Sequence, residues 1–153
     1  MEYRRAKTED IDELVKNRID MRVEREEKQC PISLVDFGQR TRDYFMKHIS
    51  DERFIAWLAI EDGKIVATSG MCIYCVPPTY DNIPGQVAYL VNMYTVKEYR
   101  NQGIGSKLLE YLVEEARNRG CIRLTLNTSS AGRSIYENYG FYDLPGEMEY
   151  YLD

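Results

Sequence analysis

The sequence predicts an α/β fold in which helices flank a single mixed sheet. Segments with a strand-like pattern alternate with segments of helical period, and short runs of turn-forming residues separate them. A further observation is that no repeat, low-complexity tract or linker divides the 153 residues. At about 100–200 residues per domain, we expect one domain that spans residues 1–153.

The first part of the chain predicts one strand and two helices. Tyr3–Lys7 is typical of a short strand, and Thr8 offers an N-cap for a helix with acidic residues in its first turn. Apolar residues at helical spacing continue this helix until Pro31: Ile11, Leu14, Val15, Ile19 and Val23. Ser33 begins a second helix. Its expected buried face is formed by Leu34, Phe37, Tyr44, Phe45 and Ile49.

Three strands are expected in the middle of the chain, at Phe54–Ile60, Ile65–Val76 and Gln86–Val96. The dipeptide Asp62-Gly63 indicates a hairpin turn between the first two strands. A loop rich in proline and glycine, residues 77–85, separates the second strand from the third.

The last part of the chain returns to a helical period. Its apolar stripe is formed by Ile104, Leu108, Leu109, Leu112, Val113 and Ala116. Gly120 is suited to the position after the helix end. The remaining predicted elements are a strand at Ile122–Leu126, a helix at Ala131–Tyr139 and a strand at Met148–Leu152. The predicted order is therefore β-α-α-β-β-β-α-β-α-β.

Composition and charge exclude several classes of protein. Twenty basic and twenty-five acidic side chains give a net charge of −5, which argues against a nucleic-acid partner. The longest apolar run, FIAWLAI, is seven residues, against about 20 for a membrane span. The charged start lacks the pattern of a secretory signal. We therefore expect a soluble, cytoplasmic protein without a membrane partner.

The cysteines predict buried structural thiols rather than a metal site. Cys30, Cys72, Cys75 and Cys121 are too few for a disulfide framework. Cys72 and Cys75 form a CxxC, but positions three apart on a strand point to opposite faces of the sheet. The only histidine is His48, so no metal ligand set is expected.

The segment R-N-Q-G-I-G, residues 100–105, directly precedes the long amphipathic helix. Glycines here let several backbone N–H groups point into one concavity at the positive end of the helix dipole, which predicts an anion site. The segment does not match a dinucleotide fingerprint, because Leu108 stands where the third glycine is needed. By itself it also fits a plain helix start without a ligand.

Together with LNTSSAGRSIYENYGF near the C-terminus, this segment resembles the GCN5-related N-acetyltransferase (GNAT) family. The first segment matches the family motif [QR]-x-x-G-x-[GA] through Arg100, Gly103 and Gly105. The second matches the motif LY-[EK]-x-x-GF through Ile135, Tyr136, Glu137, Gly140 and Phe141. One helix and one strand separate the motifs, as in the family, and the predicted element order also fits.

The resemblance implies that acetyl-CoA binds where two parallel central strands splay apart. These strands correspond to Gln86–Val96 and Ile122–Leu126. Backbone groups of Met93, Tyr94 and Thr95 would then pair with the pantetheine amides, as an added strand would.

The resemblance also implies that N–H groups of residues 101–106 hold the pyrophosphate, with positive charge from Arg100 and Lys107. These two side chains equally fit a solvated helix start. The expected cofactor-binding residues are Met93, Tyr94, Thr95, Arg100, Asn101, Gln102, Gly103, Ile104, Gly105, Ser106, Lys107 and Ser129.

Acetyl transfer from a thioester to an amine needs a proton donor for the departing thiolate. The resemblance assigns this role to Tyr136, the tyrosine of the LY motif. A phenol can supply the proton because its pKa, near 10, is close to that of a thiol, about 8.5. The alternative is a core aromatic residue that packs beside Ile135 and Tyr139.

The sequence departs from the family pattern at the general base. Many relatives carry a glutamate on the strand before the glycine turn, where this chain has Val91 and Asn92. The next strand offers only Leu124 and Thr125. The amine would therefore lose its proton through ordered water or arrive neutral.

A second departure concerns the asparagine that often precedes the last helix in the family. Here Ser129 or Ser130 replaces it, with Asn127 nearby. All three are expected pantetheine or substrate contacts.

The resemblance places the acceptor site between the first two helices and the loop at residues 77–86. Acidic side chains near it would suit a cationic amine, although they also fit a solvated surface: Glu24, Glu26, Glu27 and Asp81. The expected function is an acetyl-CoA-dependent N-acetyltransferase that acts on a primary amine of a small molecule or peptide. A homodimer fits the resemblance as well.

Two other function classes stay open. The first is a catalytically silent acetyl-CoA-binding regulatory module, which the missing carboxylate base suggests. The second is an interaction domain that binds a partner through a surface with Tyr74, Tyr80 and Tyr89.

Overall fold

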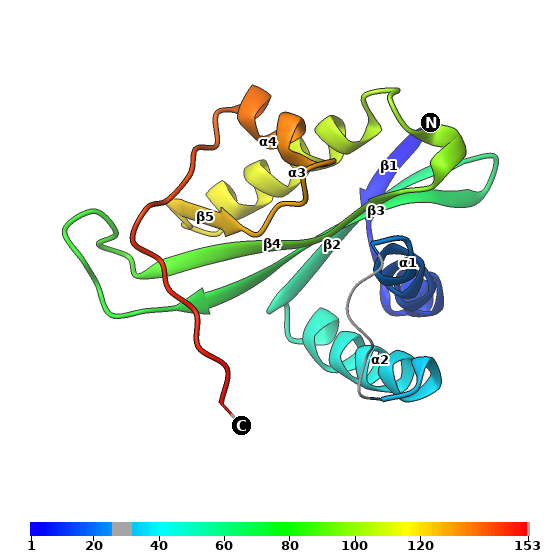
Figure 1. Cartoon of the computed structure of the whole chain (residues 1–153), viewed down its shortest axis with the longest axis horizontal. Coiled ribbons are helices and arrows are strands. Elements are labelled where there is room, and N and C mark those ends of the chain that lie inside the picture. The colour runs from blue at the N-terminus through cyan, green and yellow to red at the C-terminus, as the bar shows by residue number, and fades with distance from the viewer. Residues whose placement is uncertain (26–31, 153) are drawn as a thin grey trace.

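The computed structural model describes residues 1–25 and 32–152 (Figure 1). Five strands form one sheet in the order β1 (Glu2–Arg5), β2 (Phe54–Glu61), β3 (Lys64–Cys75), β4 (Gln86–Thr95) and β5 (Arg123–Leu126). Four α-helices accompany it: α1 (Ile11–Glu24), α2 (Leu34–Ser50), α3 (Ile104–Asn118) and α4 (Arg133–Tyr139). Neighbouring strands are antiparallel except β4 and β5, which are parallel. The predicted α/β class with a mixed sheet is confirmed.

Helices cover both faces of the sheet, with α1 and α2 on one face and α3 and α4 on the other (Figure 1). The alternation along β2 shows why both faces are apolar. Phe54, Ala56 and Leu58 pack with α1 and α2, whereas Ile55 packs with α3. Because side chains of a strand alternate between faces, one apolar run supplies both cores.

The two N-terminal helices begin differently. Ser33 caps α2 as predicted, since its hydroxyl accepts a hydrogen bond from the backbone N–H of Asp36. Thr8 caps no helix; it opens a short 3-10 turn, Thr8–Asp10, before α1. The carboxylate of Asp10 instead accepts the backbone N–H of Lys7 and both terminal nitrogens of Arg4, each at 2.8 Å. The prediction for Thr8 was therefore wrong.

The buried faces of α1 and α2 are shorter than predicted. The buried residues of α1 are Ile11, Leu14, Asn17 and Met21. Val23 in the last turn of α1 and Leu34 in the first turn of α2 are exposed, and so in part is Tyr44. Val23 and Leu34 stand in the two turns next to the connection between the helices.

Residues 141–152 are irregular, so the strand predicted at Met148–Leu152 was wrong. Its apolar side chains are exposed, with Met148 at 98% and Leu152 at 88% of their full areas. A strand is stable only where its backbone groups pair with a neighbour. Within the described ranges, β5 pairs with β4 alone, and the segment adds no strand beside it.

The cysteine prediction is right in part. Cys121 is buried, Cys72 is partly buried and Cys75 is exposed, while Cys30 lies outside the described residues. Cys75 is exposed because β3 extends there beyond the helices (Figure 1). Over residues 1–25 and 32–152, no group of His, Cys, Asp and Glu side chains is arranged to hold a metal ion. In the same ranges, no helix is both long and apolar enough to cross a membrane.

Candidate functional site

The parallel strands β4 and β5 separate in the middle of the sheet. They pair over four positions, from Val87 opposite Arg123 to Leu90 opposite Leu126, where β5 ends. Beyond Leu90, β4 continues to Thr95 with only β3 beside it among the described residues. This leaves one backbone edge of β4, at residues 91–95, open to an extended molecule that carries amide groups.

A β-bulge lies where the two strands separate. Asn92 has a positive φ of 57°, and the register between β3 and β4 shifts between Thr68 and Gly70. The hydroxyl of Thr68 donates to the backbone oxygen of Asn92 at 3.3 Å, which fixes the bulge. A bulge bends its strand and increases the local twist, so it gives a physical cause for the divergence of β4 from β5.

The turn before α3 has two residues in the left-handed region, Asn101 with φ 60° and Gly103 with φ 78°. Such alternation points successive N–H groups to one side of the backbone. The first bond within α3 runs from the N–H of Lys107 to the oxygen of Gly103, so the N–H groups of residues 104–106 have no helical partner. No side chain caps them, and the first turn carries no acidic residue. These are the properties of an anion site.

The two glycines of this turn are needed for different reasons. Gly103 requires a glycine-like backbone, whereas a Cβ at this position would meet no atom within 4 Å. Gly105 lacks a positive φ, but a Cβ there would lie 3.2 Å from the Cδ1 of Ile135 in α4. Gly103 therefore shapes the turn, and Gly105 lets α3 and α4 approach each other.

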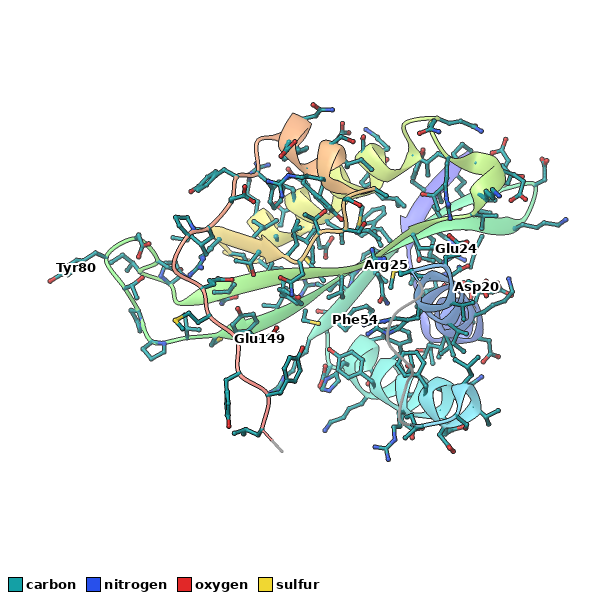
Figure 2. All side chains as sticks on the ribbon, in the orientation of Figure 1. Asp20, Glu24, Arg25, Phe54, Tyr80 and Glu149 are labelled. Carbon is teal, nitrogen blue, oxygen red and sulfur yellow. The ribbon has the colours of Figure 1, made fainter. Side chains whose placement is uncertain are left out.

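Arg100 forms an ion pair with Glu24, which Figure 2 labels at the end of α1. Glu24 also accepts a hydrogen bond of 2.7 Å from the hydroxyl of Tyr94, and Arg100 donates to the backbone oxygen of Thr95 at 2.8 Å. Hydrogen bonds from Arg100 and Tyr94 lower the pKa of Glu24. Burial, together with the bond to Glu24, raises the pKa of Tyr94 to about 12. The cluster ties the end of α1 to the end of β4.

Three other predicted cofactor residues make local contacts. Lys107 pairs with Glu110 at 2.7 Å and lies over the ring of Tyr111. Gln102 donates to the backbone oxygen of Glu98 at 3.2 Å. Ser129 accepts from the N–H of Gly132 at 3.3 Å. Their ligand contacts remain predictions.

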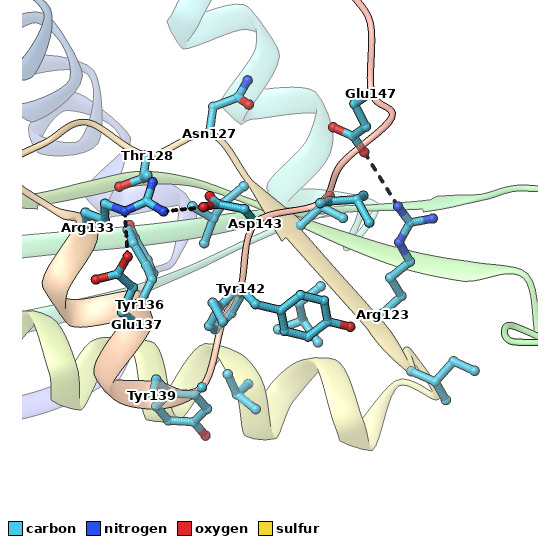
Figure 3. A pocket seen from close by; sticks show the side chains of 18 residues that line it. Arg123, Asn127, Thr128, Arg133, Tyr136, Glu137, Tyr139, Tyr142, Asp143 and Glu147 are labelled. Carbon is cyan, nitrogen blue, oxygen red and sulfur yellow. Dashed lines mark hydrogen bonds and ion pairs between the residues drawn. The ribbon is translucent and has the colours of Figure 1, made fainter.

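Tyr136 lies on α4 with 9% of its area exposed and packs edge-on against Phe141. It lines a cavity of about 830 Å³ between β5, α4 and the C-terminal segment (Figure 3). Its hydroxyl forms no hydrogen bond within the described part of the chain, and burial raises its pKa. The phenol therefore stays protonated at neutral pH.

A second pocket of about 310 Å³, which we call the α1–α2 pocket, lies between these helices and β4. Its lining residues are Arg18, Phe37, Arg40, Thr41, Tyr44, Phe45, Phe54, Cys72, Val91 and Asn92. Arg18 donates a hydrogen bond to the side-chain oxygen of Asn92. Because Asn92 is engaged as an acceptor and the described lining holds no Asp, Glu or His, the pocket offers no carboxylate or imidazole base.

Of the acidic side chains expected near an acceptor, the two that the structure describes, Glu24 and Asp81, do not line this pocket. Glu24 is engaged by Arg100 and Tyr94. Asp81 lies in the β3–β4 loop, where it accepts from the hydroxyl of Thr79 at 2.6 Å. Glu26 and Glu27 lie outside the described residues. The hypothesis of a cationic acceptor therefore gains no support from the described geometry.

Sequence reasoning missed the two arginines of the α1–α2 pocket. Arg18 and Arg40 fall outside the apolar stripes of their helices, so a pattern of hydrophobic positions gives no signal for them. Only the packing of α1 against α2 brings them together.

Residues 21–141 match the model of the acetyltransferase (GNAT) family. The chain belongs to this family. The GNAT family uses acetyl-CoA, and the crystal structure of a predicted acetyltransferase from Clostridium acetobutylicum contains acetyl-CoA. This GNAT protein is 32% identical to the Clostridium chain. The alignment covers 99% of this chain and 96% of the Clostridium chain, with a TM-score of 0.89. A GNAT structure from Ralstonia eutropha, 23% identical with a TM-score of 0.86, shows the same fold.

Curated relatives of this GNAT protein match over shorter segments. A thialysine N-epsilon-acetyltransferase of Bos taurus is 35% identical over 43% of this chain and 41% of its own length. A ribosomal protein bS18-alanine N-acetyltransferase of Escherichia coli is 34% identical over 65% of this chain and 63% of its own. The chain thus spans less than two thirds of either relative.

Proposed function

We propose that this GNAT protein is an acetyl-CoA-dependent N-acetyltransferase that acetylates a primary amine of a small molecule or peptide in the cytoplasm. One observation carries the proposal: β4 diverges from β5 and is followed by the turn before α3. That turn has residues in the left-handed region and no side-chain cap. Family membership supports acetyl transfer. Relatives named for acetylating a lysine analogue and a protein alanine support an amine as acceptor.

The open edge of β4 and the turn before α3 fit the two ends of the cofactor. Met93, Tyr94 and Thr95 lie on β4 beyond its last pair with β5, where their backbone groups would bind the pantetheine amides. The N–H groups of residues 101–106 would bind the pyrophosphate, with Arg100 and Lys107 adding positive charge. Ser129 would contact the pantetheine.

When bound, acetyl-CoA supplies the acetyl group as a thioester. The amine must be neutral to attack the thioester. Because the described lining of the α1–α2 pocket offers no carboxylate base, the ammonium ion loses its proton to water. The nitrogen bonds to the acetyl carbon, the carbon–sulfur bond breaks, and Tyr136 donates its phenol proton to the departing sulfur. Once bonded to the acetyl carbon, the nitrogen loses a second proton, which restores the phenol through water, and the proton that left the ammonium ion earlier is released to solvent.

Acceptor-dependent release of CoA thiol tests the proposal. The full chain with acetyl-CoA should release thiol faster when primary amines are added, and mass spectrometry should find the acetylated amine. Binding of acetyl-CoA without acceptor-dependent release over a broad amine panel would instead favour a regulatory module, which the missing base also suggests.

A further inference from the structure

We infer that the acceptor carries a carboxylate on an apolar body as well as its amine, and that Arg18 and Arg40 bind this carboxylate in the α1–α2 pocket. The inference rests on the proposed function and adds the class of acceptor. It concerns residues that lie outside both sequence motifs.

The walls of the pocket are mostly apolar. Phe37 and Phe45 belong to α2, Phe54 to β2 and Val91 to β4. Figure 2 labels Phe54 between the sheet and α2. Aromatic and aliphatic walls of this kind favour an apolar ligand body with a few polar groups that fix its orientation. At about 310 Å³, the space suits a ligand of about amino-acid size.

The charged side chains in the described lining are both guanidinium groups. Arg18 lies with its guanidinium carbon 5.9 Å from the centre of the Phe37 ring, and it donates to Asn92 on β4. Arg40 comes from α2 and forms no ion pair with a described residue. Guanidinium groups bind carboxylates through two parallel hydrogen bonds, and apolar surroundings strengthen such bonds.

This charge also bears on the missing base. Positive groups near a bound ammonium ion favour its neutral form, because like charges repel. The two arginines would therefore hold the acceptor by its carboxylate, and their positive charge would lower the pKa of its ammonium group. A cationic acceptor such as a polyamine would be repelled by the same two groups.

A carboxylate fits these walls better than a phosphate ester. Both anions bind arginine, but a phosphate ester carries close to two negative charges at neutral pH and costs more to remove from water. We therefore commit to the carboxylate, and an amine with a phosphate ester forms one arm of the test.

Calorimetry in the presence of CoA measures the affinity of the pocket for acetylated probes and so tests this inference without turnover. The probes are N-acetyl-L-phenylalanine and N-acetyl-6-aminohexanoate, each compared with its carboxamide, and N-acetyl-O-phosphoethanolamine. At least one carboxylate should bind about tenfold more tightly than its carboxamide, as expected for a charge-assisted hydrogen bond. Arg40→Gln should remove this preference and Arg40→Lys should retain part of it. Lys47→Gln, an equal charge change at an exposed position of the same helix outside the pocket, should leave it intact.

Equal affinity within both pairs, tighter binding of the phosphate, or a preference that survives Arg40→Gln would overturn the inference. Thiol release with the corresponding free amines is measured in parallel. Release without a carboxylate preference leaves the proposed function standing and removes this inference. A carboxylate preference without release supports the pocket assignment and counts against catalysis.

Discussion

At the scale of single residues, burial decides the chemistry of Tyr136. The chain contains 13 tyrosines, all within the described residues, and only Tyr136 is buried. Tyr136 combines a buried ring, a hydroxyl without a partner in the described chain and a raised pKa. A phenol that stays protonated and lines a cavity is suited to donate a proton.

Tyr136→Phe should lower kcat by about 10²-fold, the contribution expected of a positioned general acid. The ring and its packing against Phe141 remain, so the affinity for acetyl-CoA should change little. Steady-state kinetics and calorimetry measure the two effects. An unchanged kcat would remove Tyr136 from the mechanism, and Tyr139→Phe on the same helix serves as the control.

Asp10 is a residue whose charge supports the fold. The double hydrogen bond from Arg4, aided by the N–H of Lys7, lowers the pKa of Asp10 below its ordinary value. Asp10→Asn should reduce the free energy of unfolding by about 2 kcal/mol at neutral pH, the range of hydrogen bonds to charged groups. Urea denaturation measures this loss, and Glu9→Gln, an exposed acid in the same turn, should have little effect.

The same residue predicts a pH dependence with a defined sign. Because its folded pKa lies below the unfolded value of about 3.9, the contribution of Asp10 is complete above that pH. It is lost as the pH falls through the folded pKa. The stability difference between the wild type and Asp10→Asn should therefore shrink as the pH is lowered below about 4. A difference that stays constant down to about pH 2 would contradict the assignment.

At the scale of elements, the turn between β4 and α3 combines two kinds of constraint. Its start is fixed by Arg100, which bonds back to Thr95 and to Glu24 on α1. Its end is fixed by the left-handed Gly103 and by the contact of Gly105 with α4. The turn is thus shaped before any ligand arrives, which reduces the ordering cost of binding.

Gly103→Ala should weaken acetyl-CoA binding, because a left-handed alanine costs about 1–2 kcal/mol and the free turn would relax away from the conformation that presents its N–H groups. Gly103→Asn is the matched variant, since asparagine tolerates this backbone region and the position has open space around it. We expect Kd values in the order wild type, Asn, Ala, from tight to weak, by calorimetry. Equal Kd values for all three would mean that the turn does not contact the cofactor.

Gly105→Val should act through packing. Its side chain would press on Ile135, so we expect a lower Tm together with weaker acetyl-CoA binding. The double variant with Ile135→Ala makes room and should recover part of the Tm. No recovery would show that the glycine is required for a reason other than contact with α4.

At the scale of the whole molecule, the sheet separates two helical layers, and each layer lines a pocket of its own. α3 and α4 cover the face next to Tyr136, and α1 and α2 enclose the α1–α2 pocket on the other face. Between these layers, β4 and β5 pair only as far as Leu90 and Leu126. That residues 1–153 form one domain, and that the chain forms a homodimer, stay predictions.

Acetyl-CoA should stabilise the full chain in thermal unfolding, whereas NADH and ATP at equal concentration should not. At 100 times the dissociation constant, binding adds about 2.7 kcal/mol. For a chain of this size, each kcal/mol raises Tm by about 2–4 °C, so a shift of about 5–10 °C is expected. No shift would favour the interaction-domain alternative.

The order of elements from β1 to α4 and the two motifs were predictable from sequence, because each depends on residues close together in the chain. The stripe from Ile104 to Ala116 faces the sheet as its spacing indicates, and Ser33 caps α2. The divergence of β4 from β5 followed from the family resemblance, and its local cause, the bulge at Asn92, became visible only in the pairing register.

Other features depend on segments that are distant in sequence, and only the tertiary structure decided them. Arg18 and Arg40 share a pocket because α1 packs against α2, and Arg100 meets Glu24 because the end of α1 lies beside β4. The strand expected at Met148–Leu152 shows the converse: an apolar pattern alone forms no strand when no neighbour pairs with it. Sequence thus determined the elements from β1 to α4 and the family, whereas the charge in the α1–α2 pocket was decided by tertiary packing, since that charge depends on which helices meet.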